Sequence, residues 1–392
     1  MNPSFSISQQ REQWLIDIRR DLHRCPELSY QEFKTAAYLE KCLQELGIPC
    51  RTRVARTGLV GWLGSDDPAA PCIALRADMD ALPLQEETGL AFSSANPGVM
   101  HACGHDGHMA MLLGAASLLK DNDLPGKVLL IFQPAEENYG GAHKIIEEGH
   151  LDGVTAIFSG HLDRHFGPGE IAVEPGLICA YTDSFIITVK GRGGHAGKPH
   201  ETVDAIVVAS LLVMSIQTLV SREINPVYPS VVSVGKINGG TANNVIAEHA
   251  TLEGTIRTTN EEVRHTIING LKRMVGAMRD LYNAEASIDI RPGYPPIVNS
   301  PGATAVARRA AVDTVGEEMV RGLPIPSMGG EDFAYYLQKV PGCFARIGAR
   351  KEGWEQFPAH SPHFDFDERA LAVGASFLAR TAFLALTEPD AI

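Results

Sequence analysis

The sequence predicts an α/β protein in which a small α+β domain is inserted into a larger domain with a mostly parallel central sheet flanked by helices. At 392 residues, the chain is long for a single hydrophobic core. In its first part, short apolar runs alternate with helical segments, as expected for a parallel sheet. After residue 183 the order becomes β-α-β-β-α-β, which is typical of a ferredoxin-like unit.

The larger domain is expected to begin with two amphipathic helices. Apolar residues recur at helical spacing from Trp14 to Leu22 and again from Phe33 to Leu46, and Gly47 ends the second helix. Strands and helices then alternate. We expect strands at 72–75, 128–132 and 154–158 and helices at 108–119 and 142–148.

The inserted domain is expected to span residues 183–293, which leaves 1–182 and 294–392 to the larger domain. The chain returns to the larger domain through Gly293-Tyr294-Pro295-Pro296, a composition that favours a hinge. Within the insertion we expect strands at 184–190, 230–237, 251–257 and 287–290 and helices at 203–220 and 261–282.

The composition is that of a soluble globular protein, with 44% hydrophobic and 21% charged residues. The net charge of −13 argues against nucleic acid or an anionic membrane as a partner. Seven cysteines without a Cys-x-x-Cys pair argue against a disulfide framework and favour a reducing compartment. Residues 1–20 do not resemble a signal peptide, and 205–220 is expected to be too short to span a bilayer. We therefore expect a cytoplasmic protein.

Residues 100–108 read Met-His-Ala-Cys-Gly-His-Asp-Gly-His. A structural loop has no need of three histidines, a cysteine and an aspartate, which are costly to desolvate. Cys103 and His105 stand two apart, so in extended backbone both side chains leave the same face and can reach one ion. A thiolate beside an imidazole suits Zn, Mn, Co or Ni rather than Mg or Ca. This segment predicts a metal site.

Three further polar clusters follow expected strands, at 76–83, 133–137 and 159–161. Open α/β sheets place their ligand sites beyond the carboxyl ends of their strands, so these clusters are expected to meet. In the pair Glu136-Glu137, neighbouring side chains leave a loop in different directions. One carboxylate can bind metal while the other faces a water. Metal-assisted hydrolysis needs both a metal ligand and a general base that takes the proton of the water.

With these motifs the chain resembles the M20 metallopeptidases, in the amidohydrolase branch that contains hippurate hydrolases, aminoacylases and auxin-conjugate hydrolases. The resemblance runs almost end to end. Its specific motifs lie at 76–83, 100–106, 133–137, 193–196, 244–246 and 331–333. It implies a homodimeric or larger di-metal amidohydrolase that cleaves the amide bond of N-acyl amino acids or small peptides beside a free carboxylate. The insertion would be its lid and dimerisation domain.

The resemblance also implies two divalent ions per chain, with Zn, Mn, Co and Ni as candidates. Cys103 would lie as a thiolate between the two ions. The last ligand would come from His360-Ser361-Pro362-His363-Phe364, where His360 is preferred and His363 is the runner-up. The full ligand set that the resemblance implies is Cys103, His105, Glu137, His161 and His360.

The remaining roles are carried over in the same way. Glu136 matches the general base, and Asp80 matches a carboxylate that orients a ligand. His195 matches a histidine that stabilises the oxyanion, typically from the partner subunit. Asn244 and Arg257 match groups that hold the substrate, and the arginine fork suits a carboxylate. Because these last three lie on the insertion, substrate is expected to bind across the interface between the domains.

The chain departs from the family pattern at two places. Ala247 stands where the family usually has proline, and 162–166 reads Leu-Asp-Arg-His-Phe where apolar or aromatic residues are usual. The second departure leaves the preferred acyl group and amino acid open, because that loop leads out of the metal site.

Three other functions would each account for part of the sequence. Residues 191–196 satisfy the dinucleotide pattern G-x-G-x-x-A, but no helix is expected to begin inside it and no acidic residue closes the strand at 230–237, as an NAD-type Rossmann oxidoreductase requires. In a cysteine hydrolase, His105 would have to activate Cys103, yet it is better placed to share a metal with it. An inactive binding homologue would be expected to have lost Glu136 or a ligand.

Overall fold

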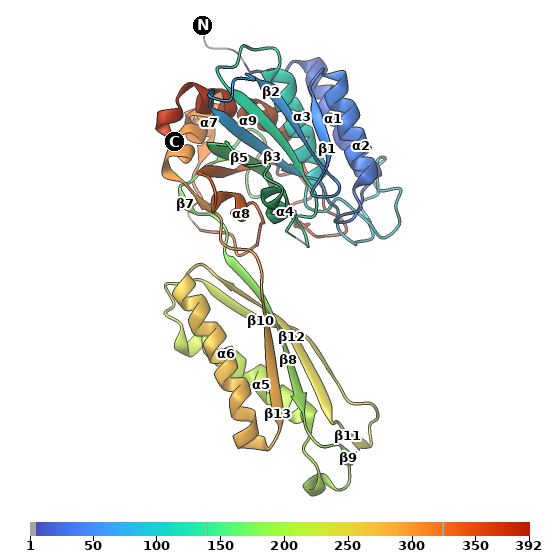
Figure 1. Ribbon diagram of the computed structural model, residues 1–392. Helices are drawn as coiled ribbons and strands as arrows, with labels where there is room; N and C mark the ends of the chain where they lie inside the picture. The colour runs from blue at the N-terminus through green and yellow to red at the C-terminus, as the bar shows by residue number, and fades with distance from the viewer. Residues whose placement is uncertain (1–4, 139, 324) are drawn as a thin grey trace. The chain divides into compact units, whose positions relative to one another are not determined.

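The computed structural model describes residues 5–138, 140–323 and 325–392 (Figure 1). The chain divides into two compact units. Unit 1 runs to Ile178 and also contains Ile297–Ile325 and Asp332–Ile392; unit 2 comprises Cys179–Pro296 and Pro326–Glu331. Each unit has its own cluster of buried apolar side chains.

Unit 1 is built on an eight-stranded sheet. In spatial order its strands are β1 (Cys50–Val54), β2 (Gly58–Gly64), β4 (Lys127–Gln133), β3 (Cys72–Asp78), β5 (Ala156–Asp163), β16 (Gly342–Gly348), β6 (Ile171–Ala172) and β15 (Val320–Arg321). A short separate pair joins β7 (Gly176–Leu177) and β14 (Val298–Asn299). The four central strands β4, β3, β5 and β16 are parallel, while β1, β2 and β6 form antiparallel pairs. The predicted α/β fold is confirmed.

Only β3, β4 and β5 of this sheet correspond to strands expected at stated residues, and the long strands β1 and β2 in the first part of the chain were missed. β2 is largely buried, but Gly58, Gly61 and Gly64 interrupt its apolar run, so it lacks the β-branched pattern of a strand. β1 alternates between half-buried and exposed residues, which gives a weak apolar signal. Both lie at one edge of the sheet, where β2 pairs with β4, the parallel strand that leads into the loop of Glu136 and Glu137.

The α-helices of unit 1 are α1 (Gln9–Arg24), α2 (Phe33–Glu45), α3 (His105–Leu119), α4 (Gly141–Glu147), α7 (Pro301–Val315), α8 (Ala334–Leu337) and α9 (Arg369–Thr387). All fifteen residues of α3 are buried, because α1, α9 and β3 pack against it from different sides. This helix begins at His105, three residues before the expected start. A helix without a solvent-facing side has little freedom to shift, so its first turn is a rigid support for His105.

A buried charge network ties the first turn of α3 to both ends of the chain. The Arg19 guanidinium on α1 donates to Asp106 (2.9 Å), to Asp365 (2.7 Å) and to Glu368 (3.1 Å), and its side chain is 1% exposed. The same Asp106 carboxylate lies 2.8 Å from Nδ1 of His23. Removing one member of such a network leaves the other charges buried and unpaired, so it fixes the packing of α1 on α3.

Unit 2 has the expected order β-α-β-β-α-β. Its elements are β8 (Tyr181–Lys190), α5 (Ala205–Thr218), β10 (Ser230–Gly239), β12 (His249–Thr258), α6 (Glu261–Tyr282) and β13 (Glu285–Pro292), with a short pair of β9 (Gly194–His195) and β11 (Val245–Ile246). The four long strands are antiparallel in the order β10-β12-β8-β13. Both helices cover the same face of this sheet (Figure 1).

Two helices are long and apolar enough to cross a membrane, judged by length and composition alone: Ala205–Glu223 and Arg369–Thr387. The expectation that the stretch at 205–220 is too short is therefore wrong, because a π-helical turn extends α5 to Glu223. Core helices of soluble proteins also reach this length and apolar content. Of the apolar window in α9, 78% is buried inside unit 1, and α5 packs against the sheet of unit 2.

Candidate metal centre

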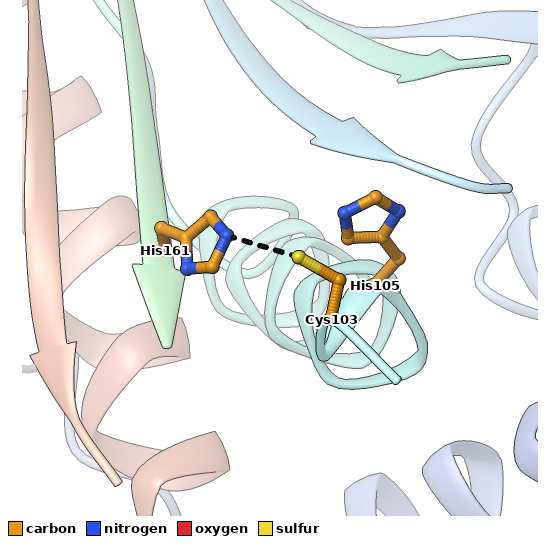
Figure 2. A group of neighbouring side chains, drawn as sticks. All are labelled: Cys103, His105 and His161. Atoms are coloured by element: carbon orange, nitrogen blue, oxygen red, sulfur yellow. Dashed lines mark hydrogen bonds between the residues drawn. The ribbon is translucent and has the colours of Figure 1, made fainter. Parts of the chain in front are cut away.

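Three potential metal ligands of unit 1 meet where α3 begins and β5 ends. Cys103 precedes α3, His105 is its first residue, and His161 lies on β5. Figure 2 shows the three side chains together, with Sγ of Cys103 3.6 Å from Nε2 of His161. One possible ligand atom from each residue lies within 4.8 Å of the other two. They form a first group able to hold an ion.

The backbone between Cys103 and His105 is not the extended one expected from their spacing. Gly104 has φ +93°, in the left-handed region, and the chain turns there into α3. A Cβ at this position would also lie 3.2 Å from Cδ1 of Leu162. Glycine is therefore favoured for both conformation and space, and the two side chains approach each other through this turn.

Hydrogen bonds orient both imidazoles of this first group. Nδ1 of His105 lies 2.9 Å from the carbonyl oxygen of Asp80, and Nδ1 of His161 lies 2.7 Å from that of Leu162. A carbonyl only accepts, so each Nδ1 donates and each neutral ring keeps its lone pair on Nε2. Among the described residues, the buried Nε2 of His105 has no hydrogen-bond partner. An unsatisfied buried nitrogen beside a cysteine and a second imidazole fits the role of a metal ligand.

A second group shares Cys103 with the first. Cys103, Glu137 and His360 also have ligand atoms within 4.8 Å of one another. Nε2 of His360 lies 3.3 Å from Oε1 of Glu137, whose side chain is 8% exposed. Two three-residue groups with one thiol in common are the arrangement that two neighbouring ions with a bridging thiolate would require.

The two histidines of the 360–364 segment lie in different surroundings. His360 has φ +68°, unusual for a residue with a Cβ, and its N–H donates to the Ala102 carbonyl at 2.7 Å. This bond ties the residue to the 100–108 segment. His363 instead has Nδ1 2.8 Å from the Glu87 carbonyl, and it is in none of the candidate metal groups among the described residues.

Burial and neighbouring charges shift the pKa values of the site residues. Burial raises the pKa of the Cys103 thiol to about 12, and the charge of Glu137 acts in the same direction. Burial lowers the pKa of His161 well below its usual range, helped by His108. Burial also opposes protonation of His105, but the charges of Asp78 and Cys103 outweigh it and raise the pKa of His105. A divalent cation would stabilise the thiolate and the neutral imidazole that ligation needs.

Asp80 organises the loop that carries the paired glutamates. Its carboxylate oxygens accept the backbone N–H groups of Glu136 and Glu137, each at 3.0 Å, and the Ser29 hydroxyl at 2.7 Å. Glu136 is 5% exposed and lies with His105 and Glu137 in a further group of close ligand atoms. Asp80 thus holds the glutamate backbone through its carboxylate and the His105 ring through its carbonyl.

His108 was not singled out as a site residue, yet it supports one. Its Nδ1 lies 2.6 Å from Asp78, its Nε2 accepts the Leu162 N–H at 3.0 Å, and its ring centroid is 4.5 Å from that of His161. Both nitrogens are occupied, so His108 orients His161 and is not free to bind an ion, although it is close to Asp78 and His105. Its spacing of three from His105 on one helix was the available signal.

In unit 2 the structure brings His195 and Asn244 together. His195 on β9 pairs with Val245 on β11, and the Ala196 N–H donates to the Asn244 carbonyl at 3.1 Å. Nδ1 of His195 accepts the Gly197 N–H at 2.9 Å, so the ring carries a proton on Nε2. His195 is exposed. The pair of β9 and β11 that carries His195 lies at one end of unit 2 (Figure 1).

Arg257 lies at the opposite end of that sheet. It is on β12 opposite Thr182, whereas β9 and β11 lie beyond His249 at the other end of the strand. From position 249 to position 257 the strand rises about 26 Å, at ~3.3 Å per residue. Burial lowers the pKa of Arg257, and among the described residues it has no ion-pair partner, since Asp183 pairs with Arg264 at 2.6 Å.

The dinucleotide pattern at 191–196 lacks the context it needs. After β8 the segment enters β9, and the next helix, α5, begins only at Ala205. A helix N-terminus inside the motif is what binds a pyrophosphate, so the oxidoreductase interpretation is not supported.

Comparison with known proteins gives a consistent result. Residues 74–383 match the model of Peptidase family M20/M25/M40. The chain is 42% identical to an N-acetyl-L-cysteine deacetylase of Bacillus subtilis, over 95% of this chain and 88% of the relative. It is 39% identical to the IAA-amino acid hydrolase ILR1-like 2 of Arabidopsis thaliana, over 98% and 88%. A crystal structure from Bacillus subtilis, described as a dinuclear metal binding peptidase from the M20 family, aligns with a TM-score of 0.82 and 36% identity over 97% and 99% of the two chains.

Proposed function

This chain belongs to peptidase family M20/M25/M40 and is a metal-dependent amide hydrolase, and we propose that it acts on N-acyl amino acids or small peptides with a free carboxylate. The observation that carries the proposal is the pair of ligand groups sharing Cys103, with Glu136 beside them. The relatives named as a deacetylase of N-acetyl-L-cysteine and a hydrolase of IAA-amino acids support an N-acyl amino acid as substrate.

The donor set fits two divalent ions. We propose Cys103, His105 and His161 as ligands of one, Cys103, Glu137 and His360 as ligands of the other, and Zn, Mn, Co or Ni as the metal. Ions bound there supply Lewis acidity, which lowers the pKa of a water and polarises the scissile carbonyl.

Glu136 is proposed as the general base. Its backbone is fixed by Asp80, and Oε1 of its side chain lies 3.4 Å from the Asp332 N–H. A carboxylate held this way can take a proton from the attacking water and pass it to the leaving amine. Asp80 would then act by positioning, since its carboxylate is occupied by the backbone N–H groups of Glu136 and Glu137.

His195, Asn244 and Arg257 are proposed to bind the substrate. A dipeptide-sized substrate spans about 7 Å, so it cannot reach both ends of β12 within one chain. We therefore propose that Arg257 binds the carboxylate in its own chain's site. His195 and Asn244 would act in the site of a partner subunit, where Nε2–H of His195 can donate to the oxyanion.

The test of this function is a hydrolysis screen of N-acetyl, N-benzoyl and dipeptide substrates, each with Zn, Mn, Co or Ni added to metal-depleted protein. We expect activity that depends on the added ion and is higher on substrates with a free carboxylate than on their amides. Full activity of metal-free protein, or no hydrolysis of any N-acyl amino acid with any of the four ions, would contradict the proposal.

Arg257→Ala is expected to lower kcat/KM for N-acyl amino acids by about 10–100-fold, the effect of losing a hydrogen bond to a charged group. The corresponding amino-acid amides lack the charge and should lose less than about threefold. Steady-state kinetics on matched acid and amide pairs measure the difference. Arg291→Ala, at an exposed arginine paired with Asp289 on β13, is the control. Equal losses on acids and amides would remove the carboxylate-binding role.

A dimer is proposed because α5 exposes an apolar face that unit 2 does not cover, made by Ile206, Val207, Leu211 and Met214. If His195 acts in the partner's site, mixing inactive Glu136→Gln with inactive His195→Ala protein should restore about a quarter of wild-type activity, since random exchange leaves one intact site in half of the dimers. Sedimentation and mass spectrometry would verify exchange. No recovery despite exchange would place His195 in its own chain's site.

We also propose a cytoplasmic location, where a reducing environment keeps Cys103 available as a ligand; it forms no disulfide in the structure. Finding the protein only outside the cell would contradict this.

A further inference from the structure

The backbone just before the paired glutamates has an unusual conformation. Ala135 has φ +57°, in the left-handed region that residues with a Cβ rarely adopt, and it is fully buried. Such a conformation persists only where the surroundings impose it. The contacts that hold Ala135 therefore also determine where Glu136 and Glu137 point.

Three successive N–H groups of this loop donate to buried carboxylates from elsewhere in unit 1. Those of Glu136 and Glu137 go to Asp80, and that of Ala135 goes to Oε1 of Glu32 at 2.9 Å. Turning Ala135 to an ordinary negative φ would move its N–H away from this acceptor. The buried N–H and the buried Oε1 of Glu32 would then both lose their hydrogen bond.

The Glu32 side chain is held in one place and does not cap the helix at which it stands. It is 0% exposed, and its second oxygen accepts the Thr57 hydroxyl at 2.6 Å. It stands at the N-cap of α2, yet its side chain makes no capping bond. The backbone N–H groups of Lys34 and Thr35 at the start of α2 are instead bound by the Glu27 carboxylate, at 2.8 and 2.9 Å.

We propose that Glu32 is a positioning residue that holds Ala135 in its left-handed conformation and so places the Glu136 and Glu137 carboxylates. The inference rests on the roles proposed above for those two glutamates. Glu32 reaches neither of them directly; its effect passes through the backbone of Ala135.

The acceptor oxygen should matter more than the negative charge. Burial raises the pKa of Glu32 to about 7, so a substantial fraction of the side chain is neutral near neutral pH. A glutamine can accept the Ala135 N–H through its oxygen and donate its amide to Thr57. A methionine of similar length can do neither.

The experiment compares Glu32→Met, Glu32→Gln and the matched control Glu27→Met. It measures kcat and KM on an N-acetyl amino acid, the Zn affinity by competition with a chelator, and the melting temperature of the metal-free protein. We expect Glu32→Met to lower kcat and Zn affinity by about 10–100-fold each, the range typical of an outer partner of a metal site. KM should change less, and Glu32→Gln should restore both quantities to within about threefold of wild type.

Glu27→Met should lower the melting temperature, because it removes the bonds at the start of α2, but leave kcat and Zn affinity of the folded protein unchanged. If Glu32→Met kept wild-type kcat and Zn affinity, or if Glu27→Met reduced them equally, the inference would be overturned. Should Glu32→Met fail to fold, Thr57→Val, which loosens the Glu32 carboxylate, is expected to cause a smaller loss of the same kind, and its absence would count against the inference.

The outcomes also separate this inference from the proposed function. If Glu137→Gln left Zn affinity unchanged, the ligand role of Glu137 would fail whatever Glu32 does. If Glu137→Gln weakened Zn binding while Glu32→Met did not, the ligand role would stand and only the positioning role of Glu32 would fall.

Discussion

Glu136→Gln is expected to lower kcat by about 10²–10⁴-fold, the usual contribution of a general acid–base group. Glutamine keeps the shape of the side chain but cannot take a proton from water. The Asp80 carboxylate binds the backbone N–H of residue 136, which the substitution leaves in place. Metal content, measured by elemental analysis of the purified protein, should therefore remain near that of wild type.

Glu137→Gln is the matched comparison, because the two residues are adjacent and both backbones are held by Asp80. It removes a proposed ligand charge, so metal affinity should fall, and adding excess metal should recover part of the activity. The opposite pattern, with metal lost in Glu136→Gln and retained in Glu137→Gln, would exchange the roles of base and ligand.

Cys103→Ser is expected to weaken metal binding by more than the ~10–100-fold that follows loss of an outer partner. Cys103 belongs to both ligand groups, so one substitution affects two ions at once. A serine hydroxyl is a far poorer bridging anion near neutral pH than a thiolate. Metal per chain after gel filtration, and affinity by chelator competition, measure the effect, and activity should fall in parallel.

Cys343→Ser is the control for burying a hydroxyl in place of a thiol. Cys343 is 1% exposed on β16, and burial raises the pKa of its thiol to about 12, as at Cys103. It belongs to none of the candidate metal groups among the described residues. Its replacement should lower stability without changing the metal content. A Cys103→Ser protein that retained two tightly bound ions would contradict the bridging role.

Much of the fold could be predicted because its signals are local. The helix at 261–282 was expected with the same bounds as α6, whose apolar residues repeat with helical period. In the structure the Asn260 side chain caps its start and Asn283 ends it in the left-handed conformation. The βαββαβ order of unit 2 followed from strands of alternating pattern. β2 was missed because burial on both faces, interrupted by glycines, leaves no alternation to detect.

The sequence predicted which residues form the site, but not the backbone geometry that brings them together. Cys103 and His105 do lie together, but a left-handed Gly104 brings them there and not an extended strand. Contacts such as Glu32 to Ala135 or His108 to Leu162 join residues far apart in the chain, and no spacing rule reveals them. The separation of Arg257 from His195 likewise depends on strand register in unit 2.

The position of β16 in the sheet has a consequence for synthesis. β16 (Gly342–Gly348) pairs over its full length with residues 157–163 of β5. On the ribosome, β5 emerges long before its neighbour, and the whole continuous segment Cys179–Pro296, with its own core, is made in between. The nascent chain must therefore carry an open, apolar strand edge while unit 2 folds, which makes unfinished chains prone to aggregate and favours chaperone binding at this stage.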